Sequence, residues 1–228
     1  MSIFEKALPP GRIENIAEKL SATVRSIVPI FVEAIAQDAS DFVQNFKKRD
    51  LTLKDRSPAL TDELAVETYG LDRKEIALTT LTAYLIFSVK EYLSFQHILD
   101  RKSRTYLVDR MVFLLIDDKS KNCFEKEWAK IVQTPGDSIR KKELLAGNLL
   151  SSLGVVDSSF FADDLNNIWH HYVVLIEAMS SCVILHVDKT LNLGNYPAQK
   201  QLTDEYLSAS ADFRMDGKGI QRILERLD

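Results

Sequence analysis

Apolar residues recur at steps of three and four positions along most of the chain, which is the spacing of one helix face. The segments with this spacing are 12–48, 57–69, 73–99, 104–116, 123–134, 138–153, 158–190, 198–213 and 219–227. Only 111–116 is a continuous apolar run that would also fit a buried strand, and we favour helix there because no second strand is evident to pair with it. The pattern predicts an all-α fold, an irregular bundle of about seven to nine helices.

The segment 158–190 is the longest strongly apolar stretch and contains neither proline nor glycine. We expect it to form the central buried helix, because a helix that is apolar nearly all round is usually enclosed by others. Its opposite side is a narrow polar stripe made of Asp163, Asn167, His170, Glu177, Ser181 and Asp188. His186 falls within the apolar arc and is expected to be a core histidine with a hydrogen-bonded ring nitrogen.

The polar stripe has three interpretations. The favoured one is that it faces water. Alternatively it lines a cleft or a partner surface, in which case the candidate binding residues are Asp163, Asn167, His170 and Glu177. A third interpretation is a buried structural network, where each polar group satisfies another.

Several residues mark where helices start, stop or bend. Pro29 lies inside the first helical pattern and predicts a kink or break near Ser26, because it lacks an N–H and crowds the preceding turn. Gly70 is expected to close a short helix. Asp72 and Glu75 have the spacing of a capping box. A break is expected at 100–103.

Length and composition predict one all-helical domain over 1–228, with a flexible joint at 47–60 and a C-terminal helical appendage at 197–228. The low counts of 8 glycines and 6 prolines argue against a turn-rich β fold. Cys123 and Cys182 have neither metal-ligand spacing nor the density of a disulfide scaffold, so we expect reduced thiols in a cytoplasmic protein. No segment predicts a signal peptide or a membrane span.

The sequence contains no motif that fixes a chemistry. The four histidines do not form a helical zinc pair, and no Glu-x-x-His motif of a di-iron bundle is present. A nucleophile elbow and a phosphate-binding loop are also missing from the sequence. We therefore assign no catalytic residue, no metal ligand and no cofactor, and we lean against an enzyme.

Basic residues cluster at 47–56, 101–110 and 140–142. We interpret them as solvated helix ends and loops, because the chain carries a net charge of −4 and few aromatic residues lie among them. Binding to nucleic acid is therefore not expected.

Three classes of function follow from these observations. The favoured class is a non-enzymatic regulatory or protein-interaction protein, of the inhibitor, immunity or adaptor type, whose partner is another protein or a second copy of the chain. The first alternative is a helical ligand- or metal-binding enzyme or sensor that uses the polar stripe. The second is a nucleic-acid binder that uses the basic clusters.

Overall fold

The computed structural model describes residues 7–47, 62–95, 99–134, 164–192 and 196–211. Side chains are described for 7–33, 65–95, 99–134 and 176–192, and for 197, 198 and 200–205. The described part holds seven helices, with no β-strand among them: α1 (Pro10–Lys47), α2 (Asp62–Tyr69), α3 (Arg73–Phe95), α4 (Arg101–Leu115), α5 (Lys121–Gln133), α7 (Asp164–Leu191) and α8 (Tyr196–Ala211). The all-α prediction is confirmed.

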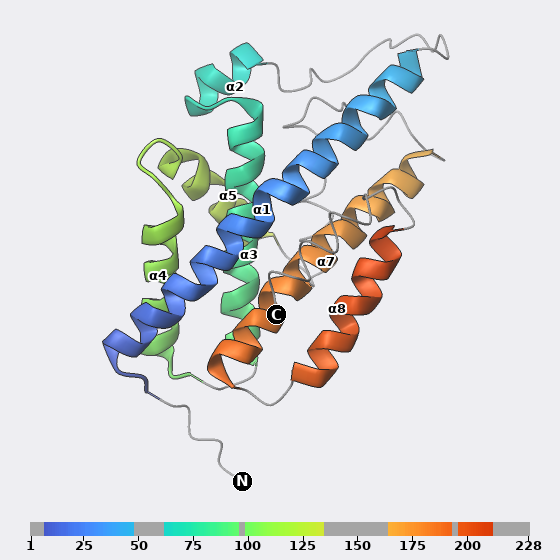
Figure 1. Cartoon of the computed structure of the whole chain (residues 1–228). Coiled ribbons are helices and arrows are strands. Elements are labelled where there is room, and N and C mark those ends of the chain that lie inside the picture. Colours follow the sequence, from blue (N-terminus) through green and yellow to red (C-terminus); the bar gives the residue numbers. More distant parts are fainter. Residues whose placement is uncertain (1–6, 48–61, 96–98, 135–163, 193–195, 212–228) are drawn as a thin grey trace.

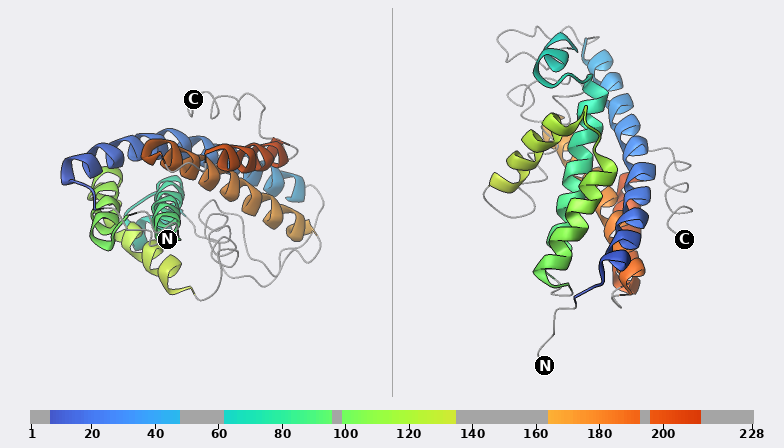
Figure 2. Two further views of the ribbon diagram at one scale, coloured as in Figure 1. Left: turned by 90° about the horizontal axis from the view of Figure 1, so that it is seen from below. Right: turned by 90° about the vertical axis from the view of Figure 1, so that its left-hand side faces the viewer.

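The helices form two layers, with α1, α7 and α8 on one side and α3, α4 and α5 on the other (Figures 1 and 2). α3 contacts helices of both layers: α1 and α7 in the first, and α4 and α5 in its own, as well as α2. The helix expected over 158–190 is α7, which packs between α1 and α8 and also contacts α3. Of the C-terminal segment 197–228, the part described is α8, which packs along α7.

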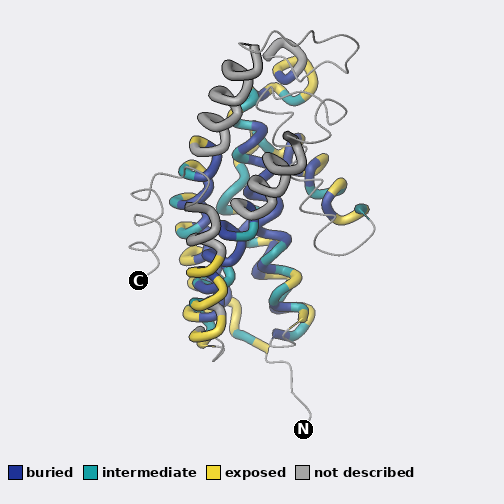
Figure 3. The backbone as a smooth tube through the Cα atoms, turned by 90° about the vertical axis from the view of Figure 1, so that its right-hand side faces the viewer, coloured by how far each residue is buried: buried dark blue, intermediate teal, exposed yellow. Residues whose placement is uncertain are grey.

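The core is one apolar cluster that spans both layers. α1 contributes a stripe of residues at helical spacing: Ile13, Ile16, Ala17, Leu20, Val24, Ile27, Val28, Phe31 and Val32. α3 is buried on most sides, and the described end of α7 adds residues from Ile176 to Val187. Figure 3 shows the buried positions along the inner sides of the helices and exposed positions on the outside.

α1 runs for 38 residues without a break at Pro29. Of the two predicted alternatives near Ser26, the break is therefore wrong, while the kink stays a prediction. Pro29 itself is exposed, while Ile27, Val28, Phe31 and Val32 around it are buried in the core. Burial of these flanking side chains outweighs the cost of a proline inside a helix, where the lost hydrogen bond and the clash of the ring with the preceding turn together amount to about 3 kcal/mol.

The junction between α2 and α3 confirms two of the local predictions. Gly70 has a φ of +69° and its N–H bonds the Val66 carbonyl at 2.9 Å, which ends α2. The Glu75 N–H then donates to Asp72 Oδ1 at 2.8 Å, and the Asp72 N–H donates to Glu75 Oε2 at 2.9 Å. These two bonds form a capping box at the start of α3.

α3 ends at Phe95, before the break expected at 100–103, and the residues at 100–103 begin α4. The Ser103 N–H donates to Asp100 Oδ1 at 2.7 Å, so Asp100 is the N-cap and the helix begins three residues before the predicted position 104. Residues 111–115 are helical, which settles the choice between helix and strand in favour of helix.

α3 is the one helix, among the described residues, that is long and apolar enough to cross a membrane by length and composition. Of its most apolar window, 72% is buried inside the protein. A buried core helix meets the same criteria, so the expectation of no membrane span stays a prediction.

Two other predictions fall on residues outside the described part. The proposed joint at 47–60 shares only Lys47 with it, as the last residue of α1. The helices predicted over 138–153 and 219–227 also lie outside the described residues.

Candidate functional site

The polar stripe of α7 is only partly within the described residues. Asp163 lies outside them, and Asn167 and His170 lie in α7 without a described side chain. Glu177 is the one candidate whose side chain is described, and it is half-buried. The assignment of these four residues as a binding site therefore stays a prediction.

The continuation of the same stripe does not face water. Ser181 and Asp188 are 5% and 1% exposed. The Tyr92 hydroxyl of α3 lies 3.4 Å from Asp188 Oδ1, which is long for a hydrogen bond between two oxygens. The water-facing interpretation is thus wrong for this end of the stripe, where a polar contact joins α7 to α3.

His186 was expected to be a core histidine, and its side chain is half-buried. Its Nδ1 atom is buried and has no hydrogen-bond partner among the described residues, so the expected bond to a ring nitrogen is not made at Nδ1. Burial lowers the pKa of His186, and the positive charges of Lys189 and Lys19 lower it further. Burial and the two nearby positive charges both favour a neutral imidazole.

Cys123 and Cys182 are both buried and are not joined in a disulfide. Burial raises the pKa of each thiol to about 12, and the nearby carboxylates of Glu127 and Asp204 act in the same direction. A thiol with such a pKa is a poor nucleophile at neutral pH. Within the described residues, no group of three or more His, Cys, Asp or Glu side chains could hold a metal ion.

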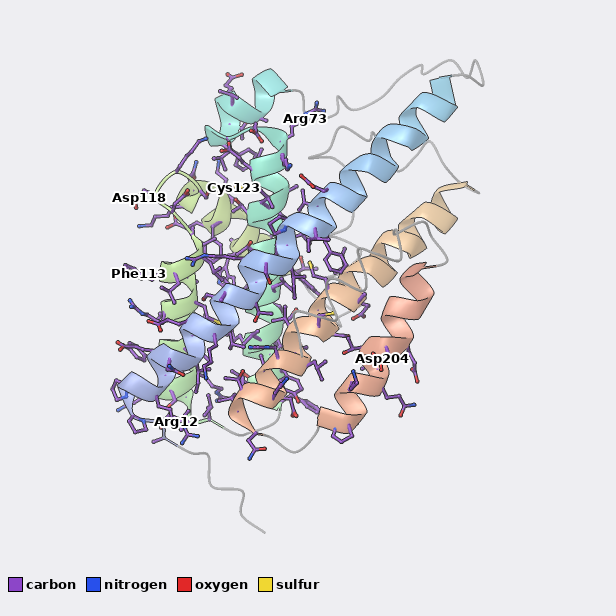
Figure 4. All side chains as sticks on the ribbon, viewed as in Figure 1. Arg12, Arg73, Phe113, Asp118, Cys123 and Asp204 are labelled. Carbon is purple, nitrogen blue, oxygen red and sulfur yellow. The ribbon has the colours of Figure 1, made fainter. Side chains whose placement is uncertain are left out.

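A feature missed in the sequence is an exposed aromatic face on α4. Phe113 is 71% exposed and points away from the bundle (Figure 4). The Arg110 guanidinium lies over its ring, 4.8 Å from the centroid. Tyr106 lies on the same side of the helix, seven residues before Phe113, and is 38% exposed.

The helical period explains why this face forms. Ser103, Leu107, Val108 and Met111 are buried on the inner side of α4. Phe113 follows Met111 by two residues, or about 200° around the helix, which places it opposite the core. The apolar run at 111–116 predicts burial of all its side chains. In a helix, however, six consecutive side chains point in all directions, so one on the outer side becomes exposed.

α4 is held firmly against α1 and the preceding chain. The Tyr106 hydroxyl donates to Glu14 Oε1 at 2.8 Å, and Arg25 donates to the Leu114 carbonyl. At the other end, the Leu8 N–H donates to Ser103 Oγ at 3.1 Å. These bonds link both ends of α4 to the N-terminal region, so its outer face is preformed.

The basic cluster at 101–110 lies on α4, while the side chains of the clusters at 47–56 and 140–142 are not among those described. Arg101 and Lys102 are exposed on this helix, but so is the acidic Asp109. Asp117 and Asp118 are exposed in the turn that follows α4. The outer face therefore carries charges of both signs around an aromatic centre.

No family model matches the sequence, and searches of curated proteins and of solved structures find no match.

Proposed function

We propose that this chain is a non-enzymatic regulatory or protein-interaction protein of the cytoplasm, and that it binds protein through the outer face of α4. The observation that carries the proposal is the exposed Phe113 ring under the Arg110 guanidinium. This face is defined by Lys102, Tyr106, Asp109, Arg110 and Phe113.

The composition of the α4 face supports a protein-binding role. Burial of a phenylalanine side chain stabilises a complex by about 1.5–3 kcal/mol, so an exposed ring on a rigid helix is a ready anchor. Aromatic and arginine side chains dominate the residues that contribute most at protein interfaces. Because α4 is already fixed to α1, little conformational entropy is lost when a partner binds it.

The charges on the α4 face favour protein over nucleic acid. A polyanion would be attracted by Arg101 and Lys102 but repelled by Asp109, Asp117 and Asp118, all of which are exposed. A protein surface can offer charges of both signs. This mixture supports the favoured class of function over a nucleic-acid binder.

The test is affinity capture from the native host with three forms of the protein: the unaltered chain, Phe113→Asp and Phe95→Asp. Phe95 is the matched control, because it is also an exposed phenylalanine, at 81%, but lies at the end of α3. We expect a stoichiometric protein partner that is lost with Phe113→Asp and retained with Phe95→Asp. Retention of every partner by a folded Phe113→Asp variant would refute this function for the α4 face.

A further inference from the structure

The starts of α1 and α4 and the ends of α3 and α7 lie together at one end of the bundle (Figures 1 and 2). The bond from the Leu8 N–H to Ser103 joins the two starts, and the Tyr92 hydroxyl lies beside Asp188 near the two ends. Phe95 is the last residue of α3, and its ring is 81% exposed. It is the most exposed large apolar side chain that the structure describes.

The same end carries exposed cations. Arg12 lies in the first turn of α1, and Arg101 and Lys102 are the first residues of α4 (Figure 4). No ion pair joins these three side chains to a carboxylate of the described residues. Lys189, in the last turn of α7, is a fourth exposed cation. We call Arg12, Phe95, Arg101 and Lys102 the cationic end.

The acidic side chains near the cationic end are mostly engaged within the fold. Asp100 accepts a backbone N–H as the N-cap of α4, and Glu14 accepts the hydroxyl of Tyr106. Glu91 is exposed, but it lies four residues before Phe95 and so about one helical turn further from this end. Positive charge therefore predominates here, although the whole chain has a net charge of −4.

The opposite end of the bundle treats its cations differently. There Lys74 pairs with Glu33 at 2.7 Å, and Lys119 pairs with Glu75 at 2.7 Å. Positive charge is thus neutralised within the fold at one end and left uncompensated at the other, where the exposed ring of Phe95 also lies.

We infer that the cationic end docks on an anionic lipid surface, with the Phe95 ring inserted at the boundary between headgroups and acyl chains. The inference goes beyond the proposed function, because the cationic end and the α4 face share only Lys102. Aromatic rings favour the membrane interface, and anionic headgroups attract lysine and arginine close to the surface. Inserted apolar area and attraction to anionic lipids together set the strength of such binding.

A lipid surface fits this arrangement better than a shaped partner does. The ring and the cations belong to different helices and share only their position at the end of the bundle. Lipids move laterally and bring headgroups to each cation, while the ring enters the acyl-chain boundary. A protein partner would have to hold a pocket and several carboxylates at fixed distances from one another.

The acidic residues further along α4 do not prevent this docking. Asp109 is eight residues after Arg101, or about 12 Å along the helix, and Asp117 follows the far end of α4. Salt screens exposed charges over about 8–10 Å. A membrane that meets the bundle end-on therefore interacts more strongly with Arg101 than with Asp109, whereas a nucleic acid lying along α4 would meet both.

Co-sedimentation of the full chain with lipid vesicles tests the inference. One kind of vesicle is phosphatidylcholine alone, and the other is phosphatidylcholine mixed with the anionic lipid phosphatidylglycerol. We expect binding to the mixed vesicles at low salt and much weaker binding to phosphatidylcholine. Added salt should release the protein, because screening weakens the attraction between exposed cations and headgroups.

Variants of Phe95 test the inserted ring. Phe95→Asp should weaken binding to mixed vesicles by about tenfold or more, because it removes an apolar anchor. Phe113→Asp is the matched control and should bind as the unaltered chain does. Phe95→Trp should also bind, and its fluorescence should shift to shorter wavelength as the indole leaves water; the unaltered chain supplies the background from Trp128 and Trp169.

The double variant Arg12→Ala and Arg101→Ala tests the charges. Each cation close to an anionic surface contributes about fivefold to binding, so the loss of both should weaken it by about twentyfold. Lys121→Ala is the control, because Lys121 is exposed at the start of α5, next to the opposite end of the bundle. Thermal unfolding of each variant checks that it is folded.

The outcomes separate this inference from the proposed function. Lack of binding to mixed vesicles at low salt overturns the inference, and so does equal binding to both kinds of vesicle. Undiminished binding by the folded Phe95→Asp or double variant also overturns it. Loss of a captured protein with Phe95→Asp, without vesicle binding, would show that a protein occupies this end. Phe113→Asp should abolish protein capture without changing vesicle binding, so it tests the proposed function alone.

Discussion

At the scale of single residues, three carboxylates stabilise helix starts and turns. Asp100 and Asp117 each accept a backbone N–H three residues further on, and Glu75 completes the capping box of α3. Glu75 also binds Lys119 at 2.7 Å, which ties α3 to the turn before α5. Hydrogen bonds of this kind stabilise the ionised carboxylate, so these groups couple stability to pH.

Glu75 should therefore support the fold only while it is ionised. The bond from Lys119, followed by the Asp72 N–H, lowers the pKa of Glu75 below its usual 4.5. A group whose pKa is lowered by folding stabilises above its unfolded pKa, and this contribution is lost as the pH falls through the folded pKa. We expect the melting temperature of Glu75→Gln to fall less steeply below pH 4.5 than that of the unaltered chain.

Glu67→Gln is a suitable control for this experiment, because Glu67 is an exposed carboxylate on α2. Its melting temperature should follow the unaltered chain at each pH. Parallel curves for Glu75→Gln and the unaltered chain, measured by circular dichroism between pH 7 and pH 2.5, would contradict the role assigned to Glu75.

At the scale of helices, tertiary packing decides whether residues that favour a helix start or end actually produce one. Gly70 and the pair Asp72 and Glu75 act as the sequence predicts, because their effect depends only on near neighbours in the chain. Pro29 does not end α1, because core residues on either side of it hold the helix together. A local rule therefore fails where a long apolar face overrides it.

Replacement of Pro29 should increase stability. Pro29→Ala restores a backbone N–H within α1 and removes the crowding of the preceding turn, and the side chain is exposed. The helix propensities of the two residues differ by about 3 kcal/mol, so we expect a gain of about 1–3 kcal/mol in the free energy of unfolding. Urea denaturation measures this directly.

Pro10→Ala is the matched control, because Pro10 is the first residue of α1 and an N–H there has no partner within the helix. Its effect should be below about 0.5 kcal/mol. A loss of stability in Pro29→Ala would mean that the core requires the local geometry that the proline imposes.

In the candidate sites, the sequence predicts which residues share a helix face, but only the packing shows whether that face is buried. The burial of Ser181 and Asp188 depends on the side of α7 that meets α3, which periodicity along α7 alone does not specify. Glu127 is 2% exposed and pairs with Lys130 at 2.6 Å, although both residues read as surface charges. Phe113 is the opposite case: it lies in an apolar run whose pattern indicates burial, yet its side chain is exposed.

At the scale of the whole molecule, one continuous core joins helices that are far apart in sequence. α1 and α7 are in contact although more than a hundred residues separate them. Cys123 is buried in a small satellite cluster with Ala65, Leu71 and Ile76, and Cys182 lies in the main core. The two thiols thus report on different parts of the packing.

Both thiols should be protected in the native protein. Their burial and their pKa of about 12 keep them inaccessible and protonated at pH 8. We expect a colorimetric thiol reagent to react slowly with the folded chain and to label both cysteines rapidly in urea. Single Cys123→Ser and Cys182→Ser variants assign the two rates, and rapid labelling of either residue without denaturant would show that its cluster opens readily.

The contact between α1 and α7 has a consequence for synthesis on the ribosome. The buried stripe of α1 is made first, yet the residues of α7 that cover it, from Ile176 onwards, follow more than a hundred positions later. At about 5–20 residues per second, that interval lasts roughly 7 to 30 seconds. During translation the nascent chain carries an amphipathic helix whose apolar side has only part of its final cover. This interval is when a chaperone would be most useful to the protein.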